Sequence, residues 1–533
     1  MNSRFMLSVA AITLLGMVSS LDARGFDIGH NRRVNDLLSL DINVSREDRG
    51  NRDNLIVGDM IGGGEHHKGG RQTNQIPLDA NASAVDVELR AFINQNRLNG
   101  QFGQRSRADI NSEKSQLGMK LFFTKGLGGD KDAACVTCHH PVLGGGDNLS
   151  MSIGVGAVEA DVLGEGRVHN PNATNYDDGY APVPRNAPTT FNIALWRRAI
   201  FLDGRVERVR GGISTPDSGF GIADINVGRN LTEAQARFPL VSSEEMKGFT
   251  FEAGSSNDIT RSHLASRLSD STSADYIANS WQDEFTPVYG ANSVNINNIT
   301  DAIASYEDSQ IFVNTPWKSY VEGNLTAISD EAKNGAKLFY ASYQNGGVSC
   351  VSCHRGNFFT DERYHVMAIP QVGVGKGNGV TGDDDFGRFN VSARDKYAFR
   401  TPTLLNVEVT GPWGHDGAYT TLEGIVAHMA NPESAVAGYD TSLLDSSVKT
   451  TNMTTNTANA LAQLNVNKQT GISRHQNVTL STSEVNDLVS FLKTLTDPCV
   501  KDRECIGKWI PDNTQTGPDN LRLNAVNSSS DLL

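Results

Sequence analysis

Cysteine is scarce in this chain, at six of 533 residues, so the fold does not rest on a scaffold of disulfides. No apolar run after residue 18 approaches the length of a membrane span. Acidic residues outnumber basic ones by 61 to 47, and the net charge of −14 argues against nucleic acid or an anionic membrane as a partner. Glycine, by contrast, is abundant at 52 residues, which is typical of a loop-rich protein.

The one long apolar run lies near the first residue. Arg4 precedes an apolar core over residues 5–18, and small residues follow at Ser19, Ser20 and Ala23. This order is typical of a secretory signal peptide, and the core is shorter than the ~20 residues that a membrane span needs. We therefore predict a signal peptide over 1–23 and a periplasmic or otherwise exported protein without a membrane span. An uncleaved anchor is the alternative interpretation.

Two short motifs carry the strongest chemical signal, because residues 135–139 (CVTCH) and 350–354 (CVSCH) are both C-x-x-C-H. Two thiols at this spacing reach both vinyl groups of one haem, and the following His lies under the iron as its proximal ligand. We therefore predict two covalently bound haem c groups. The residues concerned are Cys135, Cys138 and His139 in the first motif and Cys350, Cys353 and His354 in the second.

A zinc site and a thioredoxin-like redox pair are the alternatives for a C-x-x-C sequence. Zinc would require the two pairs to lie close together or to have further ligands at suitable spacing, but they are 215 residues apart. A thioredoxin-like pair has no need of the following His. Covalent haem also agrees with export, because its attachment takes place outside the cytoplasm.

The haem motifs also organise the chain. Residues 24–85 are rich in Asn, Arg and Gly and predict a poorly structured N-terminal arm. Helical patterns over 112–123 and 329–340 each lead through a loop into a haem motif, and strand patterns are sparse. We therefore predict a mainly α fold of two cytochrome-c-like haem domains with long loops. The predicted ranges are 86–325 for the N-terminal haem domain, 326–497 for the C-terminal haem domain and 498–533 for a tail.

Two further features receive no catalytic role. Cys499 and Cys505 predict a local disulfide in the tail, as expected in an oxidising compartment. Residues 377–382 match the dinucleotide fingerprint G-x-G-x-x-G, but no βαβ unit surrounds them, and the three Asp at 383–385 would repel a pyrophosphate. We therefore exclude a dinucleotide site there.

Several ordered segments give the chain a family resemblance. Over about residues 112–495 it resembles the bacterial di-haem cytochrome c peroxidase and MauG family. The matching segments are 144–149 (GGGDNL), 185–189 (RNAPT), 201–205 (FLDGR), 358–361 (FFTD), 399–404 (FRTPTL) and 410–417 (TGPWGHDG). The resemblance implies that peroxide reacts at the haem on His139 and that the haem on His354 relays electrons.

The resemblance also implies a second axial ligand for the relay haem. In peroxidases of the family this ligand is a Met fourteen positions after the His of the last segment, and here Met429 stands at that distance from His415. MauG-like proteins carry Tyr there. A thioether ligand raises the reduction potential, which suits a haem that accepts electrons from a small donor protein. Core packing of Met429, or ligation by the neighbouring His428, is the alternative.

The family places a Gln and a Glu ten residues apart beside the reacting haem, and this chain has Gln235 and Glu245. The resemblance implies that Glu245 shuttles the peroxide proton as acid and base while Gln235 orients the peroxide. The alternative for Glu245 is an ordinary helix-start residue.

The family also implies a calcium ion between the domains. Its ligands here would be the Asn186 side chain and the backbone carbonyls of Thr410 and Pro412, an oxygen-only set that suits a hard cation.

Two positions depart from the family pattern. Many family peroxidases carry a distal His sixteen residues after the proximal one, and here that position is Val155, which cannot ligate iron. We therefore expect the first haem to be open in the oxidised protein, with His169 as the nearby alternative ligand. Relatives carry Trp between the haems at the position of Leu202, so we expect slower or differently routed electron transfer unless Trp196 substitutes.

The sequence thus predicts an exported di-haem peroxidase that reduces H₂O₂ to water with electrons from a small cytochrome c or blue copper protein. Steering by charge suits an acidic enzyme and a basic donor. One alternative is a MauG-like or rubber-oxygenase-like enzyme that oxidises a protein residue or an organic substrate. The other is a non-catalytic electron carrier or redox sensor. By analogy with the family, the resemblance implies a homodimer as the oligomeric state.

Overall fold

The computed structural model of the protein describes residues 82–103, 108–173, 179–221, 226–512 and 514–533. The predicted signal peptide over 1–23, and nearly all of the predicted arm over 24–85, lie outside the described residues. From residue 82 onward the described chain belongs to one compact unit, Asn74–Leu533.

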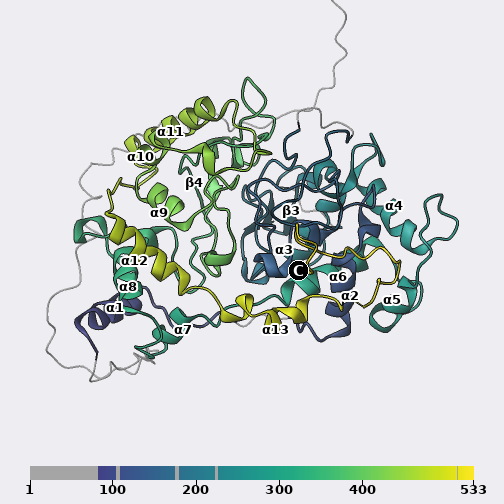
Figure 1. Cartoon of the computed structure of the whole chain (residues 1–533), viewed down its shortest axis with the longest axis horizontal. Helices are drawn as coiled ribbons and strands as arrows, with labels where there is room; N and C mark the ends of the chain where they lie inside the picture. The colour runs from purple at the N-terminus through teal and green to yellow at the C-terminus, as the bar shows by residue number, and fades with distance from the viewer. Residues whose placement is uncertain (1–81, 104–107, 174–178, 222–225, 513) are drawn as a thin grey trace, which may run out of the picture. The chain divides into compact units, whose positions relative to one another are not determined.

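Helices joined by long loops dominate the described residues, and the predicted mainly α fold is confirmed (Figure 1). The helices are α1 (Ala84–Gln95), α2 (Glu113–Phe123), α3 (Leu231–Ala236), α4 (Asn257–Ser269), α5 (Trp281–Tyr289), α6 (Ile296–Asp308), α7 (Pro316–Val321), α8 (Asp330–Tyr340), α9 (Leu422–Ala430), α10 (Pro432–Ala437), α11 (Met453–Gln469), α12 (Thr482–Lys493) and α13 (Arg503–Ile506). None of the helices among the described residues is long and apolar enough to cross a membrane.

The strands are short and all antiparallel. β1 (Ala199–Ile200), β2 (Val206–Val209) and β3 (Gly212–Ser214) form one small sheet in that order. β4 (Tyr364–His365) pairs with β5 (Phe399–Arg400) in a second. The β1–β2 turn carries residues 201–205, so this sheet sets the position of one of the segments that gave the family resemblance.

Two crossed helix pairs repeat along the chain. α2 packs on α6, and α8 packs on α12. A side chain on Gly118 of α2 would collide with the backbone carbonyl of Ala302, and one on Gly335 of α8 with that of Asp487. Each pair therefore crosses at backbone contact, which only glycine allows. We call α2, α6 and the chain between them the first module, and α8, α12 and the chain between them the second module.

Each module begins with a capped helix that leads into its haem motif. The side chain of Ser112 caps α2 and that of Ser329 caps α8, each accepting a backbone N–H three residues on. These boundaries lie within one residue of the helical patterns in the sequence. Both motifs then begin as a tight 3₁₀ turn, over Cys135–Thr137 and Cys350–Ser352.

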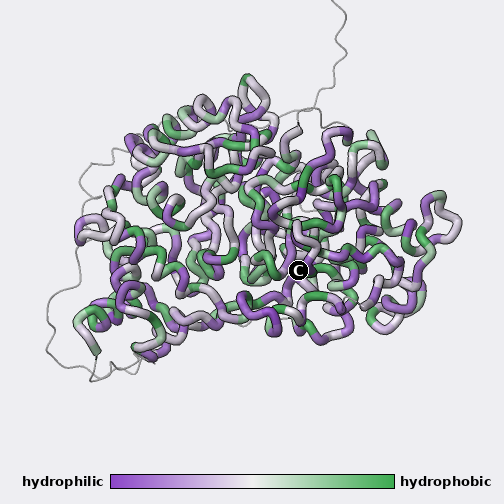
Figure 2. The backbone as a smooth tube through the Cα atoms, viewed as in Figure 1, coloured by the Kyte–Doolittle hydropathy of each residue, from purple (hydrophilic) through white to green (hydrophobic). Residues whose placement is uncertain are grey.

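Apolar residues are distributed through both modules, as Figure 2 shows, and they form a separate large core in each. The core of the first module includes Leu523 and Ala525 from the tail. The core of the second includes Leu89 and Ile93 of α1, which the sequence had assigned to the first haem domain. Hydrophobic periodicity shows that α1 has an apolar face, but it does not reveal which core that face joins.

The tail carries the predicted disulfide, since Cys499 and Cys505 are bonded. Beyond it, Leu523 donates its backbone N–H to Phe123 at the end of α2, at 2.8 Å, and Lys125 donates to Leu521 at 2.9 Å. The tail therefore lies against the first module just before the first haem motif.

The glycine crossings predict a measurable cost for a single methyl group. Gly335→Ala should lower the free energy of unfolding by about 1–3 kcal/mol, because the helices must separate to admit the Cβ atom. Urea unfolding followed by near-ultraviolet circular dichroism measures this. Gly438→Ala is the matched control, since the nearest atom to a Cβ there is an oxygen at 3.6 Å. Equal stabilities of the two variants would contradict the close crossing.

Candidate functional site

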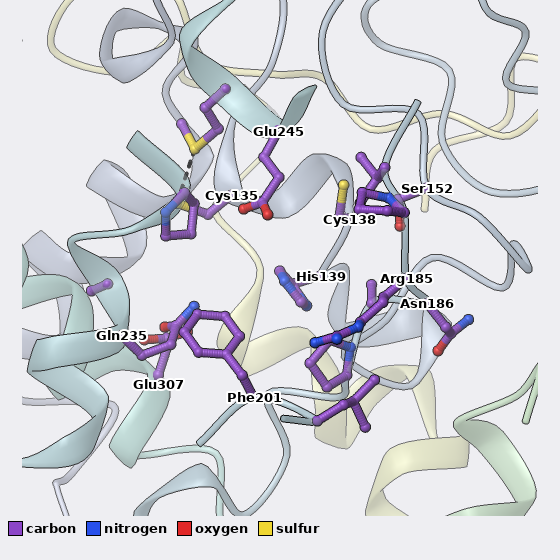
Figure 3. Close-up of a pocket in the computed structure, with 18 of the residues that line it drawn as sticks. Cys135, Cys138, His139, Ser152, Arg185, Asn186, Phe201, Gln235, Glu245 and Glu307 are labelled. Carbon is purple, nitrogen blue, oxygen red and sulfur yellow. Dashed lines mark hydrogen bonds between the residues drawn. The ribbon is translucent and has the colours of Figure 1, made fainter. Parts of the chain in front are cut away.

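A cavity of about 940 Å³, counted with the part that is open to solvent, is lined mostly by the first module, and the first haem motif opens into it (Figure 3). Residues predicted from the sequence that line it are Cys135, Cys138, His139, Asn186, Leu202, Gln235 and Glu245. The structure thus brings the first motif and the predicted acid/base pair together around one space.

Both motif histidines are held by the same backbone contact. His139 Nδ1 lies 3.1 Å from the carbonyl oxygen of Gly145, and His354 Nδ1 lies 3.0 Å from that of Phe359. Since a carbonyl only accepts, each Nδ1 carries the proton and donates, which leaves Nε2 with a lone pair for a metal. Burial lowers the pKa of both imidazoles, which favours the neutral form that ligates iron.

Glu245 lies in a single π-helical turn, Ser243–Lys247, whose position depends on a glycine contact. Gly154 packs against the backbone of Glu244 and Glu245 so closely that a Cβ atom would collide with it. Val155 donates its N–H to the Glu244 carbonyl at 3.3 Å. Buried Arg167 in turn donates to the carbonyls before Val155, at 2.6 and 2.7 Å. The loop after the first haem motif therefore supports the predicted acid/base residue.

The carboxyl of Glu245 is in an environment that favours protonation. Burial raises its pKa above the ordinary value, although the cations of Arg205 and Lys376 oppose this shift. A raised pKa makes this carboxyl a weaker acid than an exposed glutamate, which suits a group that must take up a proton and give it back. Gln235, at the end of α3, faces the same cavity.

Neither Val155 nor His169 is part of the cavity wall among the described residues. The Val155 side chain is buried in a small apolar cluster with Ala133. His169 is buried as well, and its backbone pairs with Ala157. The segment at 154–156 therefore packs against the backbone of Glu245 and is not part of the cavity wall described.

The cavity is also lined by three cationic side chains that were not predicted from the sequence: Arg185, Arg205 and Lys376. Arg205 stacks on the ring of Phe201, with its guanidinium carbon 3.6 Å from the centroid. Lys376 comes from the second module, next to the glycine-rich loop 377–382. An apolar cavity with two thiols, one imidazole and several cations fits a haem, whose ring is apolar and whose two carboxylates need partners. Arg185 and Arg205 lie within segments that matched the family, which was the available signal.

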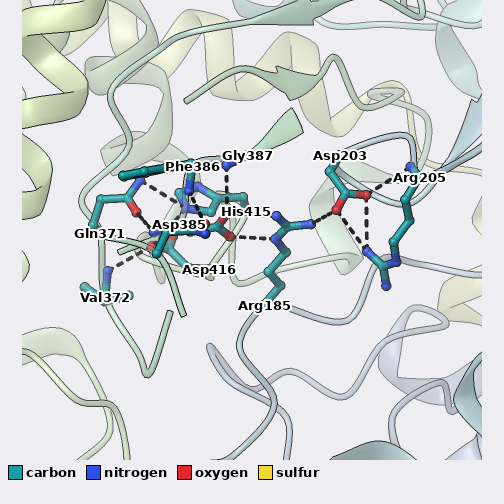
Figure 4. A network of polar contacts seen from close by, with 11 residues as sticks. Arg185, Asp203, Arg205, Gln371, Val372, Asp385, Phe386, Gly387, His415 and Asp416 are labelled. Atoms are coloured by element: carbon teal, nitrogen blue, oxygen red, sulfur yellow. Dashed lines mark hydrogen bonds and ion pairs between the residues drawn. The ribbon is translucent and has the colours of Figure 1, made fainter. Parts of the chain in front are cut away.

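Arg185 also forms the centre of a buried polar network that joins the modules (Figure 4). It donates two hydrogen bonds to Asp385 of the second module, at 2.6 and 2.8 Å, and one to Asp203 of the first, at 2.7 Å. Burial alone would raise the pKa of both carboxyls, but the facing arginines outweigh it and lower both values. Both aspartates are therefore ionised in the folded protein.

Two of the predicted calcium ligands, Asn186 and Thr410, lie at contacts between the modules. Asn186 donates its backbone N–H to the carbonyl of His415 at 3.1 Å, and its side-chain Nδ2 to that of Leu149 at 2.8 Å. This amide orientation leaves Oδ1 as the atom that would face a cation. Thr410 adjoins the glycine loop after the first motif, where a Cβ on Gly144 would meet the 409–410 backbone.

Met429 and His428 are the two candidate ligands for the second haem. They are neighbours on α9 but lie in different environments. His428 uses both ring nitrogens: Nε2 donates to the carbonyl of Met367 at 2.8 Å, and Nδ1 accepts from the hydroxyl of Tyr419 at 2.7 Å. A histidine with both nitrogens engaged has no lone pair for iron. Met429 packs in an apolar cluster that shares Trp413 and Ile425 with the core beside Cys350.

An aromatic contact connects the modules near Leu202. The ring of Trp196 lies 5.0 Å from that of Phe358, the residue before the one that holds His354. Arg400 places its guanidinium 3.4 Å from the Trp196 ring centroid and donates to the carbonyl of Phe201 at 3.0 Å. Phe201 lines the first cavity. Trp196 is therefore packed between residues that adjoin both haem motifs.

This chain is similar to proteins described as di-haem peroxidases and as MauG. A family model described as di-haem cytochrome c peroxidase matches residues 112–326. The methylamine utilization protein MauG of Methylorubrum extorquens is 27% identical over 320 residues, 60% of this chain and 69% of that protein. The cytochrome c551 peroxidase of Nitrosomonas europaea is 27% identical over 321 residues, 60% of this chain and 73% of that protein. Among solved structures, the diheme peroxidase BthA of Burkholderia thailandensis aligns with a TM-score of 0.48 and 18% identity, over 79% of this chain and 90% of that one.

The buried network predicts a pH-dependent stability. Asp385→Asn should cost about 3 kcal/mol at pH 7, because it leaves a buried guanidinium with one partner fewer. Since the folded pKa of Asp385 lies below the ordinary 3.8, its contribution is present above that pH and is lost as the pH falls below it. Stability curves of wild type and variant should therefore converge under acid conditions.

Urea midpoints measured from pH 3 to pH 7 provide the data for these curves. Glu408→Gln, which removes an exposed ion pair with Lys501, is the control and should change stability by less than about 1 kcal/mol. Parallel pH curves for wild type and Asp385→Asn would count against the ionised pair.

Proposed function

Because this chain belongs to the di-haem cytochrome c peroxidase and MauG family of oxidoreductases, we propose that it is an exported peroxidase. It would reduce hydrogen peroxide to water with electrons from a small redox protein. The observation that carries the proposal is the position of Glu245, whose partly buried carboxyl has a raised pKa and lines the same cavity as His139. A site that only transferred electrons would have no need of this group.

The chain would hold two haems through its motifs. Cys135 and Cys138 would bind the first covalently and His139 would ligate its iron. The second haem would be bound covalently by Cys350 and Cys353. Its iron would be ligated by His354 and Met429. When bound, the haems supply the one-electron steps and the iron to which peroxide coordinates. The hydrogen bonds from Nδ1 of each histidine keep the ligating nitrogen aimed at the metal.

The proton movements fall to Glu245. Reduction of one peroxide consumes two electrons and two protons and yields two waters. The Glu245 carboxylate would take the proton from the inner oxygen of bound peroxide and return it to the outer oxygen, so that the O–O bond breaks with water as the leaving group. The two consumed protons come from solvent. Gln235 would hold the peroxide in line through its amide.

Electrons would enter at the second module. Engagement of both nitrogens of His428 supports Met429 as the axial ligand there. The net charge of −14 supports a basic donor, a small cytochrome c or blue copper protein, with an association rate that falls as salt rises. The contact of Trp196 with Phe358 supports a route for electrons between the modules. This route would not need the Trp that relatives carry at the position of Leu202.

A calcium ion between the modules completes the proposal, held by Asn186, Thr410 and Pro412. The orientation of the Asn186 amide supports it, because Nδ2 is engaged and Oδ1 remains for the cation.

A MauG-like oxidation of a protein residue or an organic substrate is the second candidate. Val155 favours it, because a haem without a distal histidine is open to larger substrates. Met429, at the position where MauG-like proteins carry Tyr, favours the peroxidase.

The role of Glu245 predicts a large kinetic loss. Glu245→Gln should lower peroxidase turnover at least about 100-fold, because the amide cannot shuttle a proton. The assay follows oxidation of a reduced cytochrome c by H₂O₂. Glu244→Gln is the matched control, since the Glu244 carboxylate accepts from the hydroxyl of Ser242 at 3.1 Å and belongs to no part of the cavity wall described. Full turnover in Glu245→Gln would remove the acid/base role.

The replacement of a distal histidine by Val155 predicts the resting spin state. The ferric protein as isolated should show a high-spin signal from the first haem beside a low-spin signal from the second, because only the second has two side-chain ligands. Electron paramagnetic resonance at low temperature measures this. Two low-spin signals without a high-spin component would show that another side chain, such as His169, closes the first site.

A further inference from the structure

Glu307 is a buried acid in the wall of the first cavity to which the mechanism above gives no role. It lies in the last turn of α6 and is 3% exposed, yet it lines the cavity together with Gln235 and Glu245 (Figure 3). Its Oε2 has no hydrogen-bond partner among the described residues. A buried carboxyl without a partner costs several kcal/mol if it is charged, so the group is present as a neutral acid with an O–H to donate.

The second module shows that helix packing does not require an acid at this position. The two helix crossings can be aligned on their closest contact, because Gly118 meets Ala302 as Gly335 meets Asp487. Five residues after Ala302 stands Glu307, and five residues after Asp487 stands Leu492. Leu492 is buried in the apolar core of its module. The same structural position is therefore apolar at the relay site and acidic at the cavity that would receive peroxide.

Gln235 supplies the complementary group. Its side-chain oxygen, Oε1, is buried and also has no partner among the described residues. α3, which carries Gln235, packs on α6. The two helices run antiparallel, since Thr232 bonds Asp308 at 2.6 Å and Arg237 bonds Asn297 at 3.1 Å. Gln235 and Glu307 therefore enter the cavity from neighbouring turns of the two helices. Gln235 brings an unpaired acceptor, Oε1, and the protonated carboxyl of Glu307 brings an unpaired donor.

We propose that Glu307 is a positioning residue of the peroxide pocket, whose carboxylic O–H donates to Oε1 of Gln235. This contact fixes the amide so that its N–H groups face the ligand bound at the first iron. The proposal rests on the proposed function for the identity of that ligand. Glu307 itself does not touch the peroxide and acts through Gln235.

Cyanide bound to the ferric first haem is a suitable probe, because its outer atom accepts a hydrogen bond and its affinity does not depend on turnover. Four holoproteins are compared by optical titration: wild type, Glu307→Leu, Gln235→Leu and the double variant. Leucine is the residue that the second module carries at this position. Each single change should weaken cyanide binding about three- to tenfold, the range for one lost hydrogen bond.

The double variant should bind cyanide no more weakly than either single variant, because both changes break one coupled unit. Glu307→Gln, which keeps a donor, should bind within about twofold of wild type. Unchanged affinity in Glu307→Leu would overturn the proposal, and so would losses that add in the double variant. A purely structural role would lower the melting temperature of Glu307→Leu without changing its cyanide affinity.

Infrared spectroscopy gives an independent readout that needs only the conservative variant. Wild-type holoprotein should show the C=O absorption of a buried protonated carboxylic acid, and Glu307→Gln should lose it. Absence of that band from wild type would overturn the proposal. Neither measurement involves peroxide turnover, so a failure of the peroxidase function and a failure of the Glu307 contact give different results.

Discussion

A buried guanidinium links the two modules at the wall of the cavity. Arg185 binds Asp203 of its own module and Asp385 of the other, and the next residue, Asn186, reaches across to His415. Without this guanidinium the buried carboxylate of Asp385 would lose its ion-pair partner, at a cost of several kcal/mol, and Asp203 would keep only Arg205. The wall of the first cavity therefore keeps its shape only while the modules stay docked. Lys376 belongs to the second module, and it too lines the cavity only in the docked arrangement.

The local structure near the haem motifs was predictable from the sequence. The helical patterns over 112–123 and 329–340 became helices that start after Ser112 and Ser329, because a serine cap followed by an apolar face specifies a helix without help from distant residues. Long-range packing was not predictable. The apolar face of α1 joins the second core and Leu523 joins the first, since nothing in either segment encodes which partner it meets.

The candidate site shows the same division. His139 was predicted because attachment of a haem fixes the C-x-x-C-H spacing, and Glu245 was predicted from the family resemblance. Arg205 and Lys376 were not found, because a basic residue in a loop is ordinarily solvated and only the fold turns it inward. Glu307 was not assigned for a related reason, since its burial at the end of α6 follows from the packing of the folded chain and not from its sequence neighbours.

The two ends of the described chain complete cores that were begun far away in sequence. Arg90 of α1 bonds the carbonyl of Val321, 231 residues later, and Leu523 closes onto Phe123, at the end of the helix that leads into the first haem motif. A chain that emerges from its N-terminus exposes residues 135–139 long before residue 523 arrives to cover the neighbouring helix. The contact between Leu523 and Phe123 therefore forms late, after all the residues between them have been made.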